Sequence, residues 1–133
     1  MKLYILSIDA GTTGITILIL DKKAAIRKRY YKEFAQHYPQ PGWVEHNGEE
    51  IWEVTYKLIQ CAFRDYAPRD CAAIGITNQR ETTIIWDRKT SKPIYNAIVW
   101  QCRRTQKICQ KLKDAGYEDL FCNKTGLVID SYF

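Results

Sequence analysis

The sequence of 133 residues has too few histidines and no cysteine spacing of the kind that metal sites use. Its two histidines are His37 and His46, and none of its five cysteines forms a C-x-x-C pair, so no zinc-binding spacing is present. An odd number of cysteines cannot all pair within one chain. We therefore expect reduced thiols, most of them buried, in a cytoplasmic protein. The cysteines are Cys61, Cys71, Cys102, Cys109 and Cys122.

Long hydrophobic runs and two common catalytic motifs are also missing. Asp9 interrupts the first apolar stretch, which excludes a secretory signal, and no segment has the length needed to cross a bilayer. The absence of G-x-x-x-x-G-K-[ST] excludes a Walker phosphate loop, and the absence of G-x-S-x-G, with so few histidines, argues against a serine hydrolase. A net charge of +5 suits a phosphate-bearing ligand but is too small to indicate nucleic acid by itself.

The composition that remains is globular, and its opening segments predict β-strands. Apolar residues make up 46% and charged residues 26% of the chain, which fits one folded domain. Residues 3–8, 15–20 and 26–34 are β-prone and are separated only by short turns. Strands joined by short turns pair antiparallel, so the chain should open with a three-stranded meander.

Helical and strand patterns alternate in the rest of the chain. Asn47 is a good helix N-cap, and Glu50 three residues later resembles a capping box in front of an amphipathic helix that ends before Pro68. Residues 71–77 then predict a strand that the helix allows to be parallel to the first one. We expect a hairpin from residues 82–86 and 94–100, and a second amphipathic helix over 105–115 with Gly116 after it. The segment 125–130 has no predicted partner.

The turn after the first strand carries chemistry. Asp9 ends the strand, and Gly11-Thr12-Thr13-Gly14 follows. Glycines permit tight turns whose backbone N–H groups can face an anion, and a carboxylate can hold a hydrated Mg²⁺. A plain hairpin turn with Asp9 as a local cap explains the same residues, and spacing alone does not decide between the two.

A polar loop and a tryptophan form two further candidates. Arg80 and Glu81 lie in a run of polar residues after the predicted strand 71–77, where such a pair could bind the hydroxyls of a polyol. Spacing alone favours an exposed loop with a weak surface ion pair. Trp100 could form the wall of a small pocket or simply pack in the core. The basic residues of 103–113 are spread around the predicted helix and indicate a solvated face.

The stretch 22–32 is basic and contains Tyr30 and Tyr31. It could be a nucleic-acid patch, but an edge strand protected from aggregation by lysines explains it better.

Five separated segments together resemble the glycerol kinases of the FGGY carbohydrate kinase family. They are SIDAGTTG at 7–14, YPQPGWVEH at 38–46, GITNQRETT at 75–83, YNAIVWQCRRT at 95–105 and TGLVID at 125–130. They occur in the family's order from about Ile5 to Phe133. Because that family is several times longer than this chain, residues 1–133 would be the N-terminal part of its first domain, with the second domain absent.

The resemblance implies a fold, a reaction and roles for particular residues. The fold would be α/β, a ribonuclease H-like (actin-like ATPase) domain with a mixed sheet, incomplete here. The reaction would be ATP-dependent phosphorylation of glycerol to sn-glycerol 3-phosphate by the full-length protein. The nucleotide would meet Gly11, Thr12, Thr13 and Gly14, and Asp9 would contact Mg²⁺ through water. Glycerol would be bound by Arg80, Glu81, Trp100 and Tyr132.

The resemblance also places the catalytic base outside this chain, and it departs from the family pattern at one point. Glycerol kinases commonly continue the phosphate loop with Ser-Ser-Arg, where this chain has Gly14-Ile15-Thr16. The arginine that would help neutralise phosphate charge is missing at this position. We expect the full-length protein to be a homo-oligomer that binds neither nucleic acid nor membrane. The alternatives are a kinase of another polyol or sugar, a non-catalytic nucleotide-binding or regulatory module, and a basic nucleic-acid-binding domain.

Overall fold

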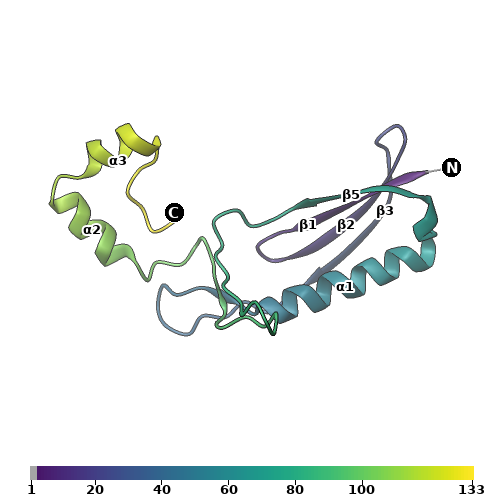
Figure 1. Ribbon diagram of the computed structural model, residues 1–133, viewed down its shortest axis with the longest axis horizontal. Helices are drawn as coiled ribbons and strands as arrows, with labels where there is room; N and C mark the ends of the chain where they lie inside the picture. Colours follow the sequence, from purple (N-terminus) through teal and green to yellow (C-terminus); the bar gives the residue numbers. More distant parts are fainter. Residues whose placement is uncertain (1–2) are drawn as a thin grey trace.

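A mixed four-stranded sheet forms one end of the molecule in the computed structural model, which describes residues 3–133. The strands are β1 (Tyr4–Ala10), β2 (Gly14–Asp21), β3 (Ile26–Glu33) and β5 (Cys71–Thr77). Their order is β3-β2-β1-β5, with β1 and β2 antiparallel, β2 and β3 antiparallel, and β5 parallel to β1 (Figure 1). The predicted opening meander and the parallel return are both confirmed.

Helix α1 (Gly48–Asp65) covers one face of the first three strands. Alternate side chains of β1 and β2, among them Leu6 and Ile17, are fully buried against the helix residues Val54 and Leu58. The side chain of Asn47 accepts hydrogen bonds from the backbone N–H groups of Glu49 and Glu50, as expected for the N-cap. Glu50 does not complete a capping box, because its carboxylate accepts the N–H of Ala35 instead.

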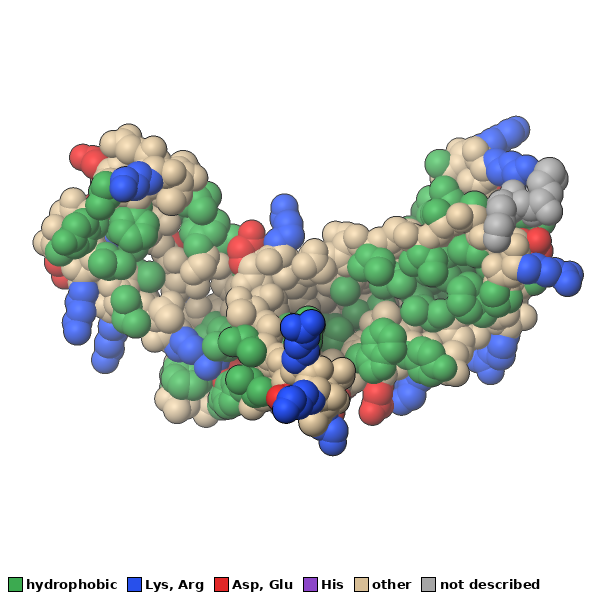
Figure 2. All heavy atoms as spheres, viewed as in Figure 1, with side chains coloured by type: hydrophobic (Ala, Val, Ile, Leu, Met, Phe, Trp, Pro, Cys, Tyr) green, Lys and Arg blue, Asp and Glu red, His purple; other side chains and the backbone are tan. Residues whose placement is uncertain are grey.

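The outer strands differ in what covers them. Strand β3 is an exposed edge rich in Lys and Arg, which agrees with a protected edge strand. Strand β5 is the edge strand outside the part of the sheet that α1 covers, so Ile74 and Ile76 are 52% and 73% exposed. Figure 2 shows hydrophobic side chains gathered over this part of the molecule.

The hairpin predicted for residues 82–86 and 94–100 forms isolated bridges but no continuous ladder. Isolated bridges join Thr83 to Ile98 and Trp86 to Pro93, but the first arm contains no regular strand. Strand β6 (Ala97–Ile98) pairs instead with β4 (Glu45–His46), which the sequence did not indicate. Pro93 has no N–H to donate, and this limits a regular ladder near the turn.

Two short helices follow, in a part of the chain that extends away from the sheet (Figure 1). Helix α2 (Gln106–Asp114) was predicted, with Gly116 in the left-handed conformation after it. Helix α3 (Glu118–Thr125) was missed, although Gly126 ends it with a left-handed conformation typical of a helix stop. Neither helix has a buried residue.

Two expectations about side chains are wrong. All five cysteines are free, but only Cys102 is buried, because the others lie on helix faces or strands that little else covers. Arg104 is not on a solvated helix face. It precedes α2 and lies against Glu45 and Trp43, because the short β4–β6 pair holds that glutamate beneath it.

Candidate functional site

The turn between β1 and β2 is tight and leaves no room for a side chain at its end. The N–H of Gly11 donates to the carbonyl of Gly14 at 3.0 Å. A Cβ at Gly14 would lie 2.7 Å from the backbone oxygen of Lys32 and 2.9 Å from the ring of Tyr31. The glycine found where the family commonly has serine is therefore required by the approach of strand β3.

The loop after β5 lies beside this turn. Because β5 is parallel to β1, the carboxyl ends of both strands reach the same edge of the sheet, where ligands of open α/β sheets usually bind. The amide nitrogen of Gln79 donates to the carbonyl of Gly11 at 3.0 Å, which ties the loop to the turn. The two motifs that the sequence singled out are thus adjacent in space.

Trp100 and Tyr132 come to the same place from the C-terminal half. The indole N–H of Trp100 donates to the Thr12 hydroxyl at 3.0 Å. The ring of Tyr132 packs edge-on against Trp100 with centroids 5.3 Å apart. An ion pair between Arg103 and Asp130, 2.6 Å long, fixes the tail that carries Tyr132.

These groups enclose an open cavity of about 340 Å³. It is lined by Gly11, Thr12, Asn78, Gln79, Arg80, Glu81, Trp100 and Tyr132. Six of the predicted site residues therefore meet around one space. Three others, Asp9, Thr13 and Gly14, belong to the same strand end and turn but do not line the cavity.

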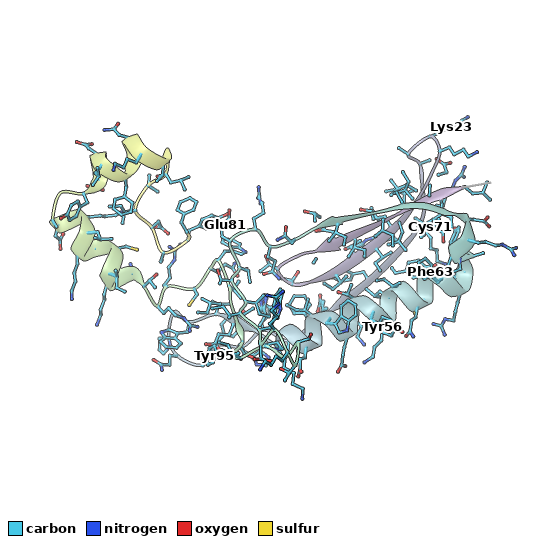
Figure 3. The ribbon with its side chains drawn as sticks, in the orientation of Figure 1. Lys23, Tyr56, Phe63, Cys71, Glu81 and Tyr95 are labelled. Atoms are coloured by element: carbon cyan, nitrogen blue, oxygen red, sulfur yellow. The ribbon has the colours of Figure 1, made fainter. Side chains whose placement is uncertain are left out.

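Arg80 and Glu81 keep their charges available. Neither takes part in the ion pairs or side-chain hydrogen bonds formed within residues 3–133, so the surface ion pair expected for a plain loop does not form. Figure 3 shows Glu81 where the sheet edge faces the C-terminal segment. A guanidinium and a carboxylate at one cavity wall offer both donors and acceptors to a ligand rich in hydroxyl groups.

Asp9 is the one acidic side chain of the β1 end, and it too is unpaired within residues 3–133. Over the same residues, no group of three His, Cys, Asp or Glu side chains is arranged to hold a metal ion. A single exposed carboxylate fits a hydrated Mg²⁺ that takes its remaining ligands from water and phosphate. It does not fit a metal enclosed by protein ligands alone.

Sequence reasoning missed several residues of the site. Asn78 and Gln79 line the cavity, yet in the polar run only Arg80 and Glu81 stood out by their charge. Gln36 and His46 lie behind the turn, where the Gln36 amide nitrogen donates to the carbonyl of Thr12 at 3.1 Å. Nothing in the local pattern of either residue indicates these contacts, which join segments far apart in the sequence.

A buried polar layer lies beneath the site. His46 is fully buried, and this burial, helped by the nearby His37, lowers its pKa to about 4 against the opposing effect of Glu50. Burial also raises the pKa of Glu45. Hydrogen bonds from Arg104, Asn96 and Tyr95 outweigh that effect and hold the pKa below its ordinary value. His46 is therefore neutral and Glu45 ionised at neutral pH.

Known proteins match the chain over nearly its whole length. The model of the FGGY family of carbohydrate kinases, N-terminal domain, matches residues 4–133. The glycerol kinase of Leptospira biflexa is 57% identical over 134 residues, covering 99% of this chain and 27% of that protein. Glycerol kinase 2 of Thermotoga maritima is 54% identical, covering 98% of this chain and 27% of that protein.

Solved structures agree with the sequence matches. The Plasmodium falciparum glycerol kinase solved with ADP superposes with a TM-score of 0.88 at 35% identity, over 98% of this chain and 26% of that one. A gluconate kinase from Lactobacillus acidophilus superposes equally well at 21% identity over 97% of this chain and 26% of that one, a likeness of fold alone. The actin-like α/β fold predicted from the resemblance is thereby confirmed.

The chain spans about a quarter of the length of these relatives. In residues 3–133 no helix is long and apolar enough to cross a membrane. The matched residues include both the turn and the polar loop that line the cavity. The chain belongs to the FGGY family of carbohydrate kinases.

Proposed function

We propose that the full-length protein transfers the terminal phosphoryl group of ATP to glycerol, giving sn-glycerol 3-phosphate and ADP. The observation that carries this proposal is the single cavity shared by the glycine-threonine turn and the Arg80–Glu81 loop. One wall suits phosphate and the other suits a small polyol. The relatives named glycerol kinase, at 54 to 57% identity, support the same reaction.

In this proposal the turn binds the nucleotide. The residues Gly11, Thr12, Thr13 and Gly14 would meet the phosphates, with Thr12 nearest the transferred group because it alone among them offers a cavity-lining side chain. Asp9 would hold Mg²⁺ through water. The ion would supply charge neutralisation, on which phosphoryl transfer strongly depends.

The opposite wall would bind glycerol. Arg80 and Glu81 would donate to and accept from its hydroxyl groups, and Trp100 and Tyr132 would cover its carbon chain. Glycerol has little apolar surface, so specificity must come from hydrogen bonds that an analogue leaves unmade. Trp100 also donates to Thr12, so the same ring would help align the two substrates.

The chemistry requires one group that this chain does not supply in our assignment. A glycerol hydroxyl oxygen forms a bond to the γ-phosphorus, the bond to the β-phosphate oxygen breaks, and ADP leaves with that electron pair. The hydroxyl proton must go to a base, which we place outside residues 1–133. These residues would be the N-terminal part of the first of two domains, and closure of the second would exclude water as a competing acceptor.

Two further statements remain predictions. We place the enzyme in the cytoplasm, since five free thiols suit a reducing compartment. We expect a homo-oligomer with no affinity for nucleic acid or membranes. The lysine-rich β3 edge is explained by protection against strand pairing.

Steady-state kinetics of the full-length protein test the proposal. Arg80→Ala should lower kcat/KM for glycerol about 10- to 100-fold, because a charged hydrogen bond contributes about 1.5–3 kcal/mol. Arg88→Ala, an exposed arginine away from the cavity, is the matched control and should leave kcat/KM unchanged. An unchanged kcat/KM for Arg80→Ala would remove Arg80 from the site. If the wild-type protein prefers another polyol in a substrate panel, that polyol would replace glycerol as the proposed substrate.

A further inference from the structure

A closed set of hydrogen bonds lies directly behind the cavity and joins its two walls. We name this set the polar circuit. Its members are Thr12, Gln36, His46, Gln79, Thr82 and Trp100. His46 is the only fully buried member, and it does not line the cavity.

Two backbone carbonyls fix the directions of the hydrogen bonds that Gln36, Gln79 and His46 form. A carbonyl can only accept, so the Gln36 amide nitrogen must face Thr12 and the Gln79 amide nitrogen must face Gly11. The Gln36 amide oxygen is then left to face His46 Nε2 at 2.7 Å. His46 Nε2 therefore carries the proton and donates it to Gln36.

The other ring nitrogen of His46 completes the connection. Its Nδ1 is an acceptor in this tautomer and lies 3.4 Å from the amide nitrogen of Gln79. The Gln79 amide oxygen accepts the Thr82 hydroxyl at 3.0 Å, and Thr82 in turn accepts the backbone N–H of Trp100 at 3.3 Å. The indole of Trp100 closes the circuit on Thr12.

We propose that His46 is a positioning residue. Through Gln36 on one side and Gln79 on the other, it fixes the turn at residues 11–14 relative to the loop at residues 78–81. This inference rests on the proposed function. One ring nitrogen contacts Gln36, which holds the carbonyl of Thr12, and the other contacts Gln79 in the loop after β5, so the two contacts can be removed separately. Phe34 packs edge-on against the imidazole with centroids 4.9 Å apart.

Two substitutions separate the two sides of the imidazole in the full-length protein. His46→Asn places an oxygen near the position of Nδ1, so it retains the acceptor for Gln79 and loses the donor to Gln36. We expect kcat/KM for ATP to fall about tenfold with the KM for glycerol changed less than threefold. His46→Gln retains the donor to Gln36 and loses the acceptor, so the KM for glycerol should rise about tenfold with kcat/KM for ATP changed less than threefold.

The controls distinguish positioning from simple loss of folded protein. His37→Asn changes the other, exposed histidine and should leave all constants unchanged. A purely structural role for His46 would lower the folded fraction in both variants without this opposite split in constants, and that result would overturn the inference. Constants within twofold of the wild type in both variants would overturn it as well.

A second variant tests the inference without changing the buried histidine. Gln36→Glu keeps an acceptor for His46 but loses the donor to the Thr12 carbonyl, so it should repeat the effect of His46→Asn. Because both act through the same carbonyl, the double variant should be no worse than the more severe single one. If the fold-changes of the two single variants multiply in the double variant, the two residues act independently, and that result would overturn the proposed role of the polar circuit.

Failure of the proposed function would look different. If the wild-type protein does not phosphorylate glycerol, the same split is read from calorimetric dissociation constants, with ADP weakened about tenfold by His46→Asn and glycerol by His46→Gln. That split would retain the positioning role while the reaction is discarded. A wild-type protein that binds neither ADP nor glycerol would overturn both.

Discussion

The two halves of this chain are held together in different ways. From β1 to β5 the structure depends on apolar packing, with alternate residues of the strands buried against α1. From residue 78 onward, few side chains are buried. Polar links join this part of the chain to the first half, together with one small apolar cluster in which Val99 and Cys102 pack against Val44. The cavity lies where the halves meet, so it combines a rigid wall with a wall that depends on specific hydrogen bonds.

The ion pair between Glu45 and Arg104 is one of these links. Their ion pair is 2.7 Å long, and both side chains are largely buried, with the guanidinium also 3.9 Å from the centre of the Trp43 ring. Arg104→Leu leaves a buried carboxylate without its charged partner and should reduce the free energy of unfolding by about 3–5 kcal/mol. Urea titration of the chain measures this change in the free energy of unfolding. Adding Glu45→Gln should restore part of the loss, and no restoration would contradict the pairing.

Truncating one apolar side chain in each half should give very different losses of stability. Ile17 is fully buried in β2, so Ile17→Ala should cost about 2–5 kcal/mol. Ile108 in α2 is 60% exposed, and Ile108→Ala should change stability by no more than about 0.5 kcal/mol. The same urea titration measures both variants. Equal losses would show that the second half has an apolar core comparable to the first.

Gly14 lies where β2 begins, and the close approach of the β3 backbone leaves no space there for a side chain. Gly14→Ala brings a Cβ to 2.7 Å from the Lys32 oxygen, which forces β2 and β3 apart. We expect a loss of about 1–3 kcal/mol, as for other overpacked sites. The midpoint of thermal unfolding provides the measurement. Gly75→Ala, where no atom lies within 4 Å of the added Cβ, is the control and should shift it little.

The buried histidine should make stability depend on pH. The unfolded chain binds a proton at His46 below about pH 6.5, whereas the folded chain does so only below about pH 4. Stability should therefore fall as the pH drops from 6.5 to 4, by up to about 1.4 kcal/mol per pH unit. His46→Gln should flatten this slope. A slope that remains in the variant would assign it to other groups, such as Glu45, whose pKa the fold also lowers.

The first half could be predicted from sequence because its pattern is local. Alternation in β1 and β2, the Asn47 cap and the heptad-like spacing of α1 each act over a few residues, and all three were confirmed. The second half was predicted less well. Helix α3 has no buried face to produce a periodic signal, and β6 pairs with β4 about fifty residues away.

The site shows the same division. Asp9, the turn, the Arg80–Glu81 pair and Trp100 stand out in the sequence itself, and the resemblance to a family added Tyr132. Gln36 and His46 did not stand out, because an isolated glutamine or histidine has no pattern until the fold brings its partners near. The roles of all these residues remain predictions.

A crystal structure of the full-length protein with ADP and glycerol tests the central claim most directly. We expect the terminal phosphate of ADP beside Gly11 and Thr12, and glycerol between Arg80, Glu81 and Trp100, with one hydroxyl directed at that phosphate. Glycerol bound away from this cavity, or a nucleotide whose phosphates do not approach the turn, would contradict the account.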